Sequence, residues 1–292
     1  MKDDRSRSTI RNVKLENPNV VLPFKTYTVK DGLIGNRIRA LMQDVKGFLW
    51  IGTTDGLSIY DGSKFKNYSE TNGLRIGSIV TIYESKFETG TVWVSQSSGE
   101  ILKIKDEHIT IYKCENTDKK NFAFCFYEDS KGVLWCGTRY GLYYLKGNKF
   151  SKVNTNQNFE SVKNIYRYSD SSIIFVSDLD CYLFDTNNYS IKLIELNINK
   201  LKEYTIDSII DEDGDLWIGI IDGSIIHLKN LRVNARYKMG TRYMQPSLSD
   251  NNGNIWVSDV NGLIKFNKSE NVSRAVLYKP ENGLPGKGFR AM

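Results

Sequence analysis

A sixfold internal repeat constrains the fold of this 292-residue chain more than any other feature of its sequence. All five tryptophans stand in one short apolar motif, which first reads Leu49-Trp50-Ile51-Gly52-Thr53. The gap between Trp135 and Trp217 is twice the others, and Phe175 lies near its middle. With Phe175 included, six units of roughly 41 residues follow one another without a linker. The tryptophans are Trp50, Trp93, Trp135, Trp217 and Trp256.

Two turns recur at fixed places in most units. An Asp-x-x-Gly turn precedes the aromatic residue, as in Asp44-Val45-Lys46-Gly47, and a second turn follows, as in Asp55-Gly56. The runs between turns are short and rich in β-branched and aromatic residues, which is typical of antiparallel strands. The sequence therefore predicts an all-β chain, a β-propeller of four-stranded antiparallel blades. The repeats are expected at about 28–68, 69–112, 113–153, 154–195, 196–233 and 234–278.

The tryptophans are expected to be buried between blades, because one sheet cannot cover both of its own faces. The turn Asp211-Glu212-Asp213-Gly214-Asp215 is acidic enough to suggest calcium. A helix–loop–helix calcium site needs glycine at its sixth position, however, and Leu216 stands there. The same turn carries Val45 and Lys46 in the first unit. We therefore expect turn geometry as its role, with no metal and no cofactor in the chain.

The unit resembles the repeat of the two-component regulator propeller family. That repeat runs from Gly-Leu through Asp-x-x-Gly and Leu-Trp-Ile-Gly-Thr to x-Asp-Gly-Leu and a final Phe-x-x-Tyr. The first unit matches throughout, from Gly32-Leu33 to Phe65 and Tyr68. The second unit lacks the Asp-Gly turn, and the fourth has lost its tryptophan. WD40 and kelch repeats are excluded, because the chain has two histidines and no Gly-Gly pair.

The resemblance, which covers about residues 24–288, implies a sensor. Propellers of this family usually form the extracytoplasmic part, periplasmic or at the cell surface, of bacterial membrane signalling proteins. They bind a glycan or another small nutrient and are covalently linked to a signalling output domain. The chain is therefore expected to be an excerpt of such a protein, and a cytoplasmic propeller if it is complete.

The net charge of +6 is concentrated at the start of the chain. We expect a flexible basic tail at residues 1–20 and a propeller at 21–292. Because the propeller itself is nearly balanced in charge, extended nucleic acid is not an expected partner. The segment Phe24-Lys25-Thr26-Tyr27 parallels Phe65-Lys66-Asn67-Tyr68, and residues 284–292 resemble the start of a further unit. A partial seventh blade, 24–27 with 284–292, would expose strand edges that favour self-association.

The propeller topology predicts the place of a ligand site. The link into the first strand of a blade and the turn between its second and third strands emerge on the same face. Arg139-Tyr140 replaces the aspartate of the Asp-Gly turn there, and a guanidinium beside an aromatic ring suits sugar faces and carboxylates. The expected ligand is an oligosaccharide or a small anion. The candidate residues are Arg37, Asp55, Arg139, Tyr140, Asp222, Arg242, Tyr243 and Asp259.

Two alternatives to a sensor remain open from the sequence, namely a lyase resembling the streptogramin type and a purely scaffolding propeller. A lyase needs a general base such as histidine near the channel. His108 is expected on an outer strand and His227 on a third strand, so neither is well placed. No serine-hydrolase elbow, zinc-protease helix or phosphate-binding glycine loop is present. We therefore predict a binding module and no catalytic residues.

Overall fold

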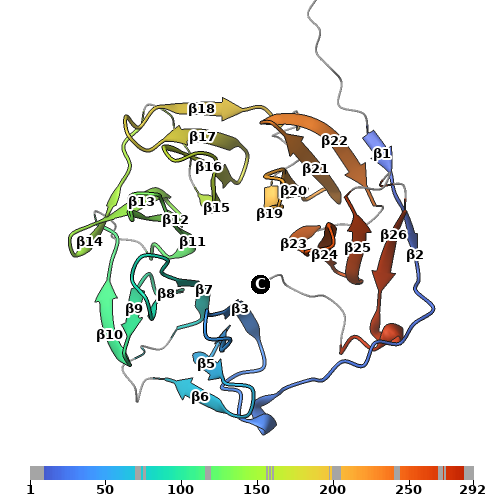
Figure 1. Cartoon of the computed structure of the whole chain (residues 1–292), viewed down its shortest axis with the longest axis horizontal. Coiled ribbons are helices and arrows are strands. Elements are labelled where there is room, and N and C mark those ends of the chain that lie inside the picture. The colour runs from blue at the N-terminus through green and yellow to red at the C-terminus, as the bar shows by residue number, and fades with distance from the viewer. Residues whose placement is uncertain are drawn as a thin grey trace, which may run out of the picture. The chain divides into compact units, whose positions relative to one another are not determined.

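The computed structural model describes residues 10–69, 74, 77–115, 120–155, 157, 159, 161–196, 198, 205–239, 244–268, 272 and 274–285. These residues form six sheets, each built on four consecutive antiparallel strands, and two of the sheets carry a fifth strand from the start of the chain. This confirms the predicted β-propeller class (Figure 1). Each sheet is one blade, numbered in chain order. The helical residues of the described part are two short 3-10 turns, Val29–Asp31 and Pro280–Asn282. The chain divides into two compact units, which we describe separately.

The four-blade unit comprises Thr26–Ser177 and Tyr182–Lys192. Each of its blades buries one face against the next. The core between blades 1 and 2 contains Trp50 and Ile79, and the core between blades 2 and 3 contains Trp93 and Phe126. The strands are, for blade 1, β3 (Ile38–Gln43), β4 (Leu49–Thr53), β5 (Leu57–Tyr60) and β6 (Phe65–Tyr68); for blade 2, β7 (Ile79–Glu84), β8 (Thr91–Gln96), β9 (Ile101–Lys105) and β10 (His108–Tyr112); for blade 3, β11 (Ala123–Glu128), β12 (Leu134–Thr138), β13 (Gly141–Lys146) and β14 (Lys149–Lys152); and for blade 4, β15 (Val162–Arg167), β16 (Ser172–Ser177), β17 (Cys181–Asp185) and β18 (Ile191–Ile194).

The two-blade unit contains Met1–Lys25, Asp178–Cys181 and Leu193–Ala291. Its core joins Trp217 of blade 5 to Ile255 and Phe266 of blade 6. The strands are, for blade 5, β19 (Thr205–Ile210), β20 (Leu216–Ile220), β21 (Ser224–Lys229) and β22 (Arg232–Lys238); and for blade 6, β23 (Gln245–Ser249), β24 (Asn254–Asp259), β25 (Gly262–Asn267) and β26 (Arg274–Tyr278).

The expectation of a flexible tail through residue 20 is wrong for residues 10–16. Strand β1 (Ile10–Asn12) pairs in parallel with β22, and β2 (Lys14–Glu16) pairs in parallel with β26. Between them Val13 is buried in the core of the two-blade unit. The tail is ordered because the outer edges of two blades offer free backbone groups and an apolar surface that this segment covers.

The expected outer strand of a partial seventh blade is also wrong, since Phe24–Tyr27 forms no strand. The Tyr27 ring instead packs on Tyr60 and Phe65 of blade 1, with ring centroids 5.2 and 5.8 Å away. Tyr27, which the motif predicts in an outer strand, instead packs on the two outer strands of blade 1, β5 and β6. The other segment predicted for the partial seventh blade is 284–292, of which residues 286–292 lie outside the described residues.

The Asp-x-x-Gly turn does more than the sequence analysis assigned to it. In blade 3, Asp129 Oδ1 accepts the N–H groups of Lys131 and Val133, 2.9 and 3.0 Å away, and thereby closes the turn. Its Oδ2 accepts the indole N–H of Trp135 at 2.9 Å. The same indole–carboxylate hydrogen bond joins Asp44 to Trp50, Asp211 to Trp217 and Asp250 to Trp256. One carboxylate thus shapes the turn and satisfies a tryptophan N–H in four of the six blades.

Blade 4 shows what changes when the tryptophan is absent. Phe175 occupies the position of the indole and is fully buried, but it has no N–H to satisfy. Six residues before it, where blades 1, 3, 5 and 6 have aspartate, stands Ser169, whose Oγ accepts the Ser171 N–H at 3.3 Å. Blade 2 keeps Trp93 but has Phe87 at this position, so a blade tryptophan does not always stand with the aspartate.

The expected burial of all five tryptophans holds for four of them. Trp256 is half-buried. It belongs to blade 6, the last blade of its unit, and it contacts residues of its own sheet. Its ring stacks on Tyr278 with centroids 5.9 Å apart, and Lys265 Nζ lies 5.2 Å from its centroid.

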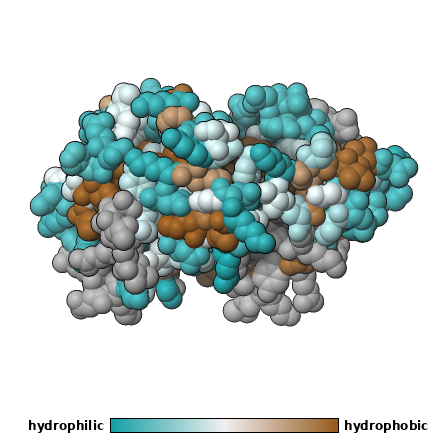
Figure 2. Space-filling view, turned by 90° about the horizontal axis from the view of Figure 1, so that it is seen from below, coloured by the Kyte–Doolittle hydropathy of each residue, from teal (hydrophilic) through white to brown (hydrophobic). Residues whose placement is uncertain are grey.

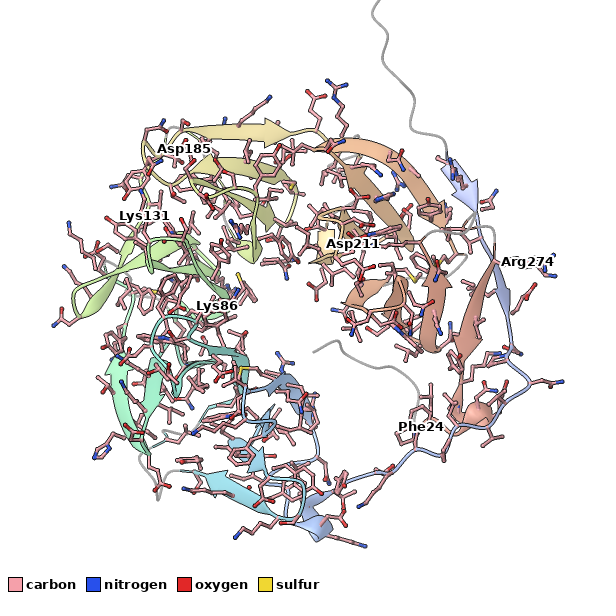
Figure 3. All side chains as sticks on the ribbon, in the orientation of Figure 1. Phe24, Lys86, Lys131, Asp185, Asp211 and Arg274 are labelled. Carbon is pink, nitrogen blue, oxygen red and sulfur yellow. The ribbon has the colours of Figure 1, made fainter. Side chains whose placement is uncertain are left out.

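The first-to-second-strand turns also bind neighbouring blades together. Glu128, at the end of β11, accepts the Lys86 N–H at 2.6 Å and the Ser85 hydroxyl at 2.7 Å from the preceding blade. Glu84 accepts the Val45 N–H of blade 1 in the same way at 2.9 Å. Figure 3 labels Lys86 and also Lys131, whose ammonium group bonds to Asn187 of blade 4.

A buried lysine joins blades 5 and 6. Lys268 Nζ lies 3.3 Å from Asp211 Oδ2, 3.2 Å from Glu212 Oε1 and 2.7 Å from Asp213 Oδ2. Asp211 is labelled in Figure 3. Although burial opposes the charged form, the carboxylates of Asp213, Glu212 and Asp211 together raise the pKa of Lys268. The same contact lowers the pKa of Asp213. The acidic turn that suggested calcium therefore holds an ammonium group.

The indole–carboxylate hydrogen bond predicts a measurable coupling. We expect Asp129→Asn, which keeps the turn acceptor but removes the acceptor for the Trp135 N–H, to lower the free energy of unfolding by about 1–3 kcal/mol. In a Trp135→Phe background the same change should cost about 1 kcal/mol less, because no N–H is left unpaired. Urea denaturation of the four proteins checks this, and equal costs in both backgrounds would contradict it.

The Lys268 contact predicts a change in pH dependence. Because the folded-state pKa of Asp213 is lowered, its contribution to stability is present at neutral pH and is lost as pH falls below about 4. Lys268→Met removes the cause of that shift. The variant should be less stable at pH 7 and should lose less further stability between about pH 4 and 2 than the parent. Thermal unfolding across this range measures both effects, and parallel curves for the two proteins would refute the assignment.

Candidate functional site

The link into the first strand of a blade lies beside the turn between its second and third strands, as the topology predicted. We call this end of a blade its link face. Backbone hydrogen bonds join the two segments in the first three blades. They run from the Thr54 N–H to the Arg37 carbonyl oxygen (3.1 Å), from Ser97 to Ser78 (2.8 Å) and from Arg139 to Phe122 (3.3 Å). The link and the turn therefore share one end of each of these three blades.

Arg37 and Asp55 come together on the link face of blade 1, and both side chains are exposed. Thr53 Oγ1 holds the turn by accepting the Asp55 N–H at 3.0 Å and donating to the Gly56 carbonyl oxygen at 3.1 Å. A Cβ atom on Gly35 would lie 2.3 Å from Asp55 Oδ2, so glycine is needed where the link passes this carboxylate. The structure thus presents a cation on the link and an anion on the adjoining turn.

Arg139 and Tyr140 form a second pair, on the link face of blade 3. The guanidinium carbon of Arg139 lies 5.8 Å from the centroid of the Tyr140 ring. Arg139 is exposed and Tyr140 is half-buried. Thr138 fixes this turn as Thr53 fixes the first, since its Oγ1 accepts the Tyr140 N–H at 3.1 Å and donates to the Gly141 carbonyl oxygen at 2.9 Å. A planar cation and a ring face are therefore held together at the surface.

Asp222, on the link face of blade 5, is bound within its own blade. Its Oδ1 accepts the Ser224 N–H at 2.9 Å, and its Oδ2 accepts from Arg236 Nη2 at 2.8 Å. Although burial opposes the charged form, the Ser224 hydrogen bonds and the Arg236 charge lower the pKa of Asp222. The sequence analysis missed Arg236, which stands in an ordinary strand motif and is brought to Asp222 by the pairing of β21 with β22.

Asp259 ends β24 and is almost fully buried. Its Oδ1 accepts the Asn261 N–H at 2.7 Å, and no group in the described part of the chain hydrogen-bonds to its Oδ2. Arg242 and Tyr243, the other predicted pair, lie outside the described residues. In the two-blade unit the structure therefore describes two of the predicted ligand residues. Asp222 is bonded to Arg236, and Asp259 is buried.

The two histidines occupy the strands that the sequence predicted for them. His108 begins the outer strand β10 and is exposed. His227 lies in β21, the third strand of blade 5, stacked on Trp217 with ring centroids 4.0 Å apart. Its Nε2 lies 2.9 Å from Asp215 Oδ2, and its Nδ1 lies 3.2 Å from Asn234 Nδ2. Both nitrogens of His227 thus have structural partners.

The described residues show no group of three or more metal-ligating acids, histidines or cysteines. Within the same residues no helix has the length and apolar character that crossing a membrane requires. In the view of Figure 2, apolar side chains appear as separate patches on a surface that is otherwise largely hydrophilic. The candidate ligand groups are therefore the polar and aromatic side chains of the link faces.

Comparison with known proteins identifies the repeat. The family model of the two component regulator propeller matches residues 32–55 and 118–140. A stretch of 57 residues, 20% of this chain and 4% of the relative, is 44% identical to a histidine kinase of Formosa agariphila. The chain thus spans a small part of that protein's length.

Solved structures share the fold at low sequence identity. One is described as the extracellular domain of a hybrid two component system from B. thetaiotaomicron, with a TM-score of 0.71 and 17% identity. That match covers 90% of this chain and 38% of the other. A luciferin-regenerating enzyme also matches, with a TM-score of 0.52 and 15% identity over 76% of this chain and 83% of the other. The fold alone therefore does not separate domains of signalling systems from enzymes.

The matched segments contain the turns and the tryptophan motif on which the resemblance was based, including Asp44, Trp50, Asp129 and Trp135. The resemblance found in the sequence is confirmed for two segments: the chain is a β-propeller in which residues 32–55 and 118–140 match the two component regulator propeller family.

Proposed function

We propose that this chain is the ligand-sensing module of a bacterial signalling protein of the two-component type. Its repeats, its similarity to part of a histidine kinase and its fold, which it shares with an extracellular domain of a hybrid two component system, support this proposal. In the proposed protein the propeller lies outside the cytoplasm and is covalently linked to a signalling output domain. Binding of a ligand to the propeller is the input signal.

We propose an oligosaccharide, neutral or acidic, as the ligand of the link faces. The observation that carries this proposal is the Arg139–Tyr140 pair, an exposed guanidinium 5.8 Å from an aromatic ring on a rigid turn. An aromatic face stacks on the apolar face of a sugar ring, and a guanidinium binds hydroxyl or carboxylate oxygens. The remaining proposed ligand residues are Arg37, Asp55, Asp222, Arg242, Tyr243 and Asp259.

An enzyme of the lyase type is the less supported alternative. A general base must have a free position from which to take a proton of the substrate. His227 is stacked on Trp217 and bonded through both nitrogens, and His108 lies on an outer strand. These positions favour a binding protein, although the fold also occurs in a luciferin-regenerating enzyme.

Calorimetric titration with neutral and uronic-acid oligosaccharides tests the proposal. We expect saturable binding without turnover, and Arg139→Ala should weaken the binding of the preferred sugar about tenfold or more, because a charge-assisted hydrogen bond is lost. Arg167→Ala is the matched control. Arg167 is equally exposed but ends β15, at the opposite end of its blade, and binds Asp170 at 2.6 Å.

Equal affinities of the Arg139→Ala and Arg167→Ala variants would show that the link face of blade 3 does not bind the sugar. Conversion of any of the oligosaccharides by the wild-type protein would favour the lyase alternative. Liquid chromatography of the titrated samples detects such conversion.

A further inference from the structure

The outer hairpin of blade 5, which joins its third and fourth strands, carries two cations side by side. Lys229 ends β21, Arg232 begins β22, and the two residues stand directly opposite each other in the strand pairing. Both side chains are exposed. Opposed residues of an antiparallel pair have neighbouring side chains, and like charges at such positions destabilise the sheet. A partner of opposite charge therefore stabilises this arrangement.

The equivalent hairpins of blades 2 and 3 have such a partner within the chain. In blade 3, Lys146 stands opposite Lys149, whose Nζ lies 2.8 Å from Glu115 Oε2. In blade 2, Lys105 Nζ lies 2.9 Å from Glu88 Oε1. Neither cation of the blade 5 hairpin forms an ion pair with the residues that the structure describes. Of these three hairpins, that of blade 5 is therefore the one whose cations are open to an external anion.

The carboxylates at the same end of blade 5 have other partners. The turn Asp211–Asp213 contacts Lys268 through all three of its carboxylates. Asp215 Oδ2 lies 2.9 Å from His227 Nε2. Lys268 is the main cause of the lowered pKa of Asp213, and Lys229 contributes less. These acidic groups therefore leave the charge of the hairpin largely uncompensated.

A pocket lies at this hairpin. It has a volume of about 420 Å³ and is lined by Lys229, Asn230, Arg232, Val233 and Asn234. Four of these five residues are polar, and two of the four carry a positive charge. A guanidinium presents a fork of N–H groups, an ammonium group is a compact charge, and both bind oxyanions. The pocket therefore suits an anion with several oxygens.

A β-bulge shapes the pocket. In the pairing of β21 with β22, Asn234 is an extra residue between two regular pairs, whereas the described outer hairpins of blades 1, 2 and 3 pair without one. Bulges redirect a side chain and are frequent beside binding sites. Asn234 Nδ2 lies 3.2 Å from Nδ1 of His227, whose Nε2 is bound by Asp215. An amide nitrogen has two N–H groups, so the buried histidine holds Asn234 while one N–H remains for a ligand.

We infer that the outer hairpin of blade 5 binds a tetrahedral oxyanion of charge about −2, either a phosphate or sulfate ion or the phosphate ester group of a sugar. Lys229 and Arg232 neutralise its charge, and Asn234 donates an N–H to one of its oxygens. Strand β21 runs from Ser224, which binds Asp222 on the link face, to Lys229 at the other end of the blade. The site is therefore separate from the sugar site proposed on the link face and does not depend on it.

Calorimetric titration of the full chain tests the site, with sodium phosphate, sodium sulfate and glucose 6-phosphate as probes at one ionic strength set by sodium chloride. We expect saturable binding of at least one probe. Lys229→Gln and Arg232→Gln should each weaken it about tenfold or more, because a charge-assisted hydrogen bond is lost. Asn234→Ala leaves the net charge unchanged and should weaken binding about fivefold, since one neutral hydrogen bond is lost.

Lys146→Gln is the matched control. It removes the same charge from the same position of the blade 3 hairpin and should leave the affinity unchanged. All the substituted side chains are exposed, so each variant should fold, and its thermal midpoint without a probe checks this.

The probes distinguish the two sources of the oxyanion. Tighter binding of glucose 6-phosphate would identify the ester group as the ligand, and tighter binding of an inorganic ion would identify a free anion; either result supports the site. The site is wrong if no probe binds saturably, if Lys229→Gln and Lys146→Gln have equal affinities, or if Asn234→Ala binds as wild type does. None of these results bears on the sugar titration of Arg139→Ala, which tests the link face.

Discussion

The hydrogen bond between a tryptophan N–H and a turn aspartate is the interaction on which four of the six blades depend. A propeller needs a large side chain to fill the space between adjacent sheets, and tryptophan fills it at the expense of burying a polar N–H. The aspartate six residues earlier accepts that N–H and also closes the turn, as Asp129 does for Trp135. Packing between blades and the geometry of the turn are therefore set by one carboxylate.

This interaction explains why the two ends of a blade differ. At the turn end, the aspartates, the Glu128 contact and the Lys268 contact bind the strands and adjacent blades together. At the link face, the hydroxyl groups of Thr53 and Thr138 hold the turns by hydrogen bonds to the turn backbone. The side chains of Asp55, Arg139 and Tyr140 are not used for this and remain at the surface. These contacts between adjacent blades lie at the turn end, and the exposed side chains of the link face are the ones that we propose for binding of the sugar.

The candidate site could be predicted from sequence only in part. The repeat locates the link-face turns, so the positions of Arg37, Asp55, Arg139 and Tyr140 followed from topology. The sequence did not reveal that Arg236 would bind Asp222 or that Asp259 would be almost fully buried. Such facts depend on which strands and links meet, and a polar residue in a short link carries no periodic signal.

The sequence by itself determined the class of fold, the repeat and the place of each tryptophan, because these follow from the spacing of aromatic residues and turns along the chain. Only the tertiary structure decided the roles of the segments before the first blade. Residues 10–16 have the composition of a tail, yet they form strands because the outer edges of β22 and β26 accept them. Phe24–Tyr27 has the motif of an outer strand, yet it forms none, since a strand needs a partner and Tyr27 packs on blade 1 instead. The local sequence pattern determines whether a segment is able to form a strand. Whether it does form one depends on a free strand edge with which it can pair.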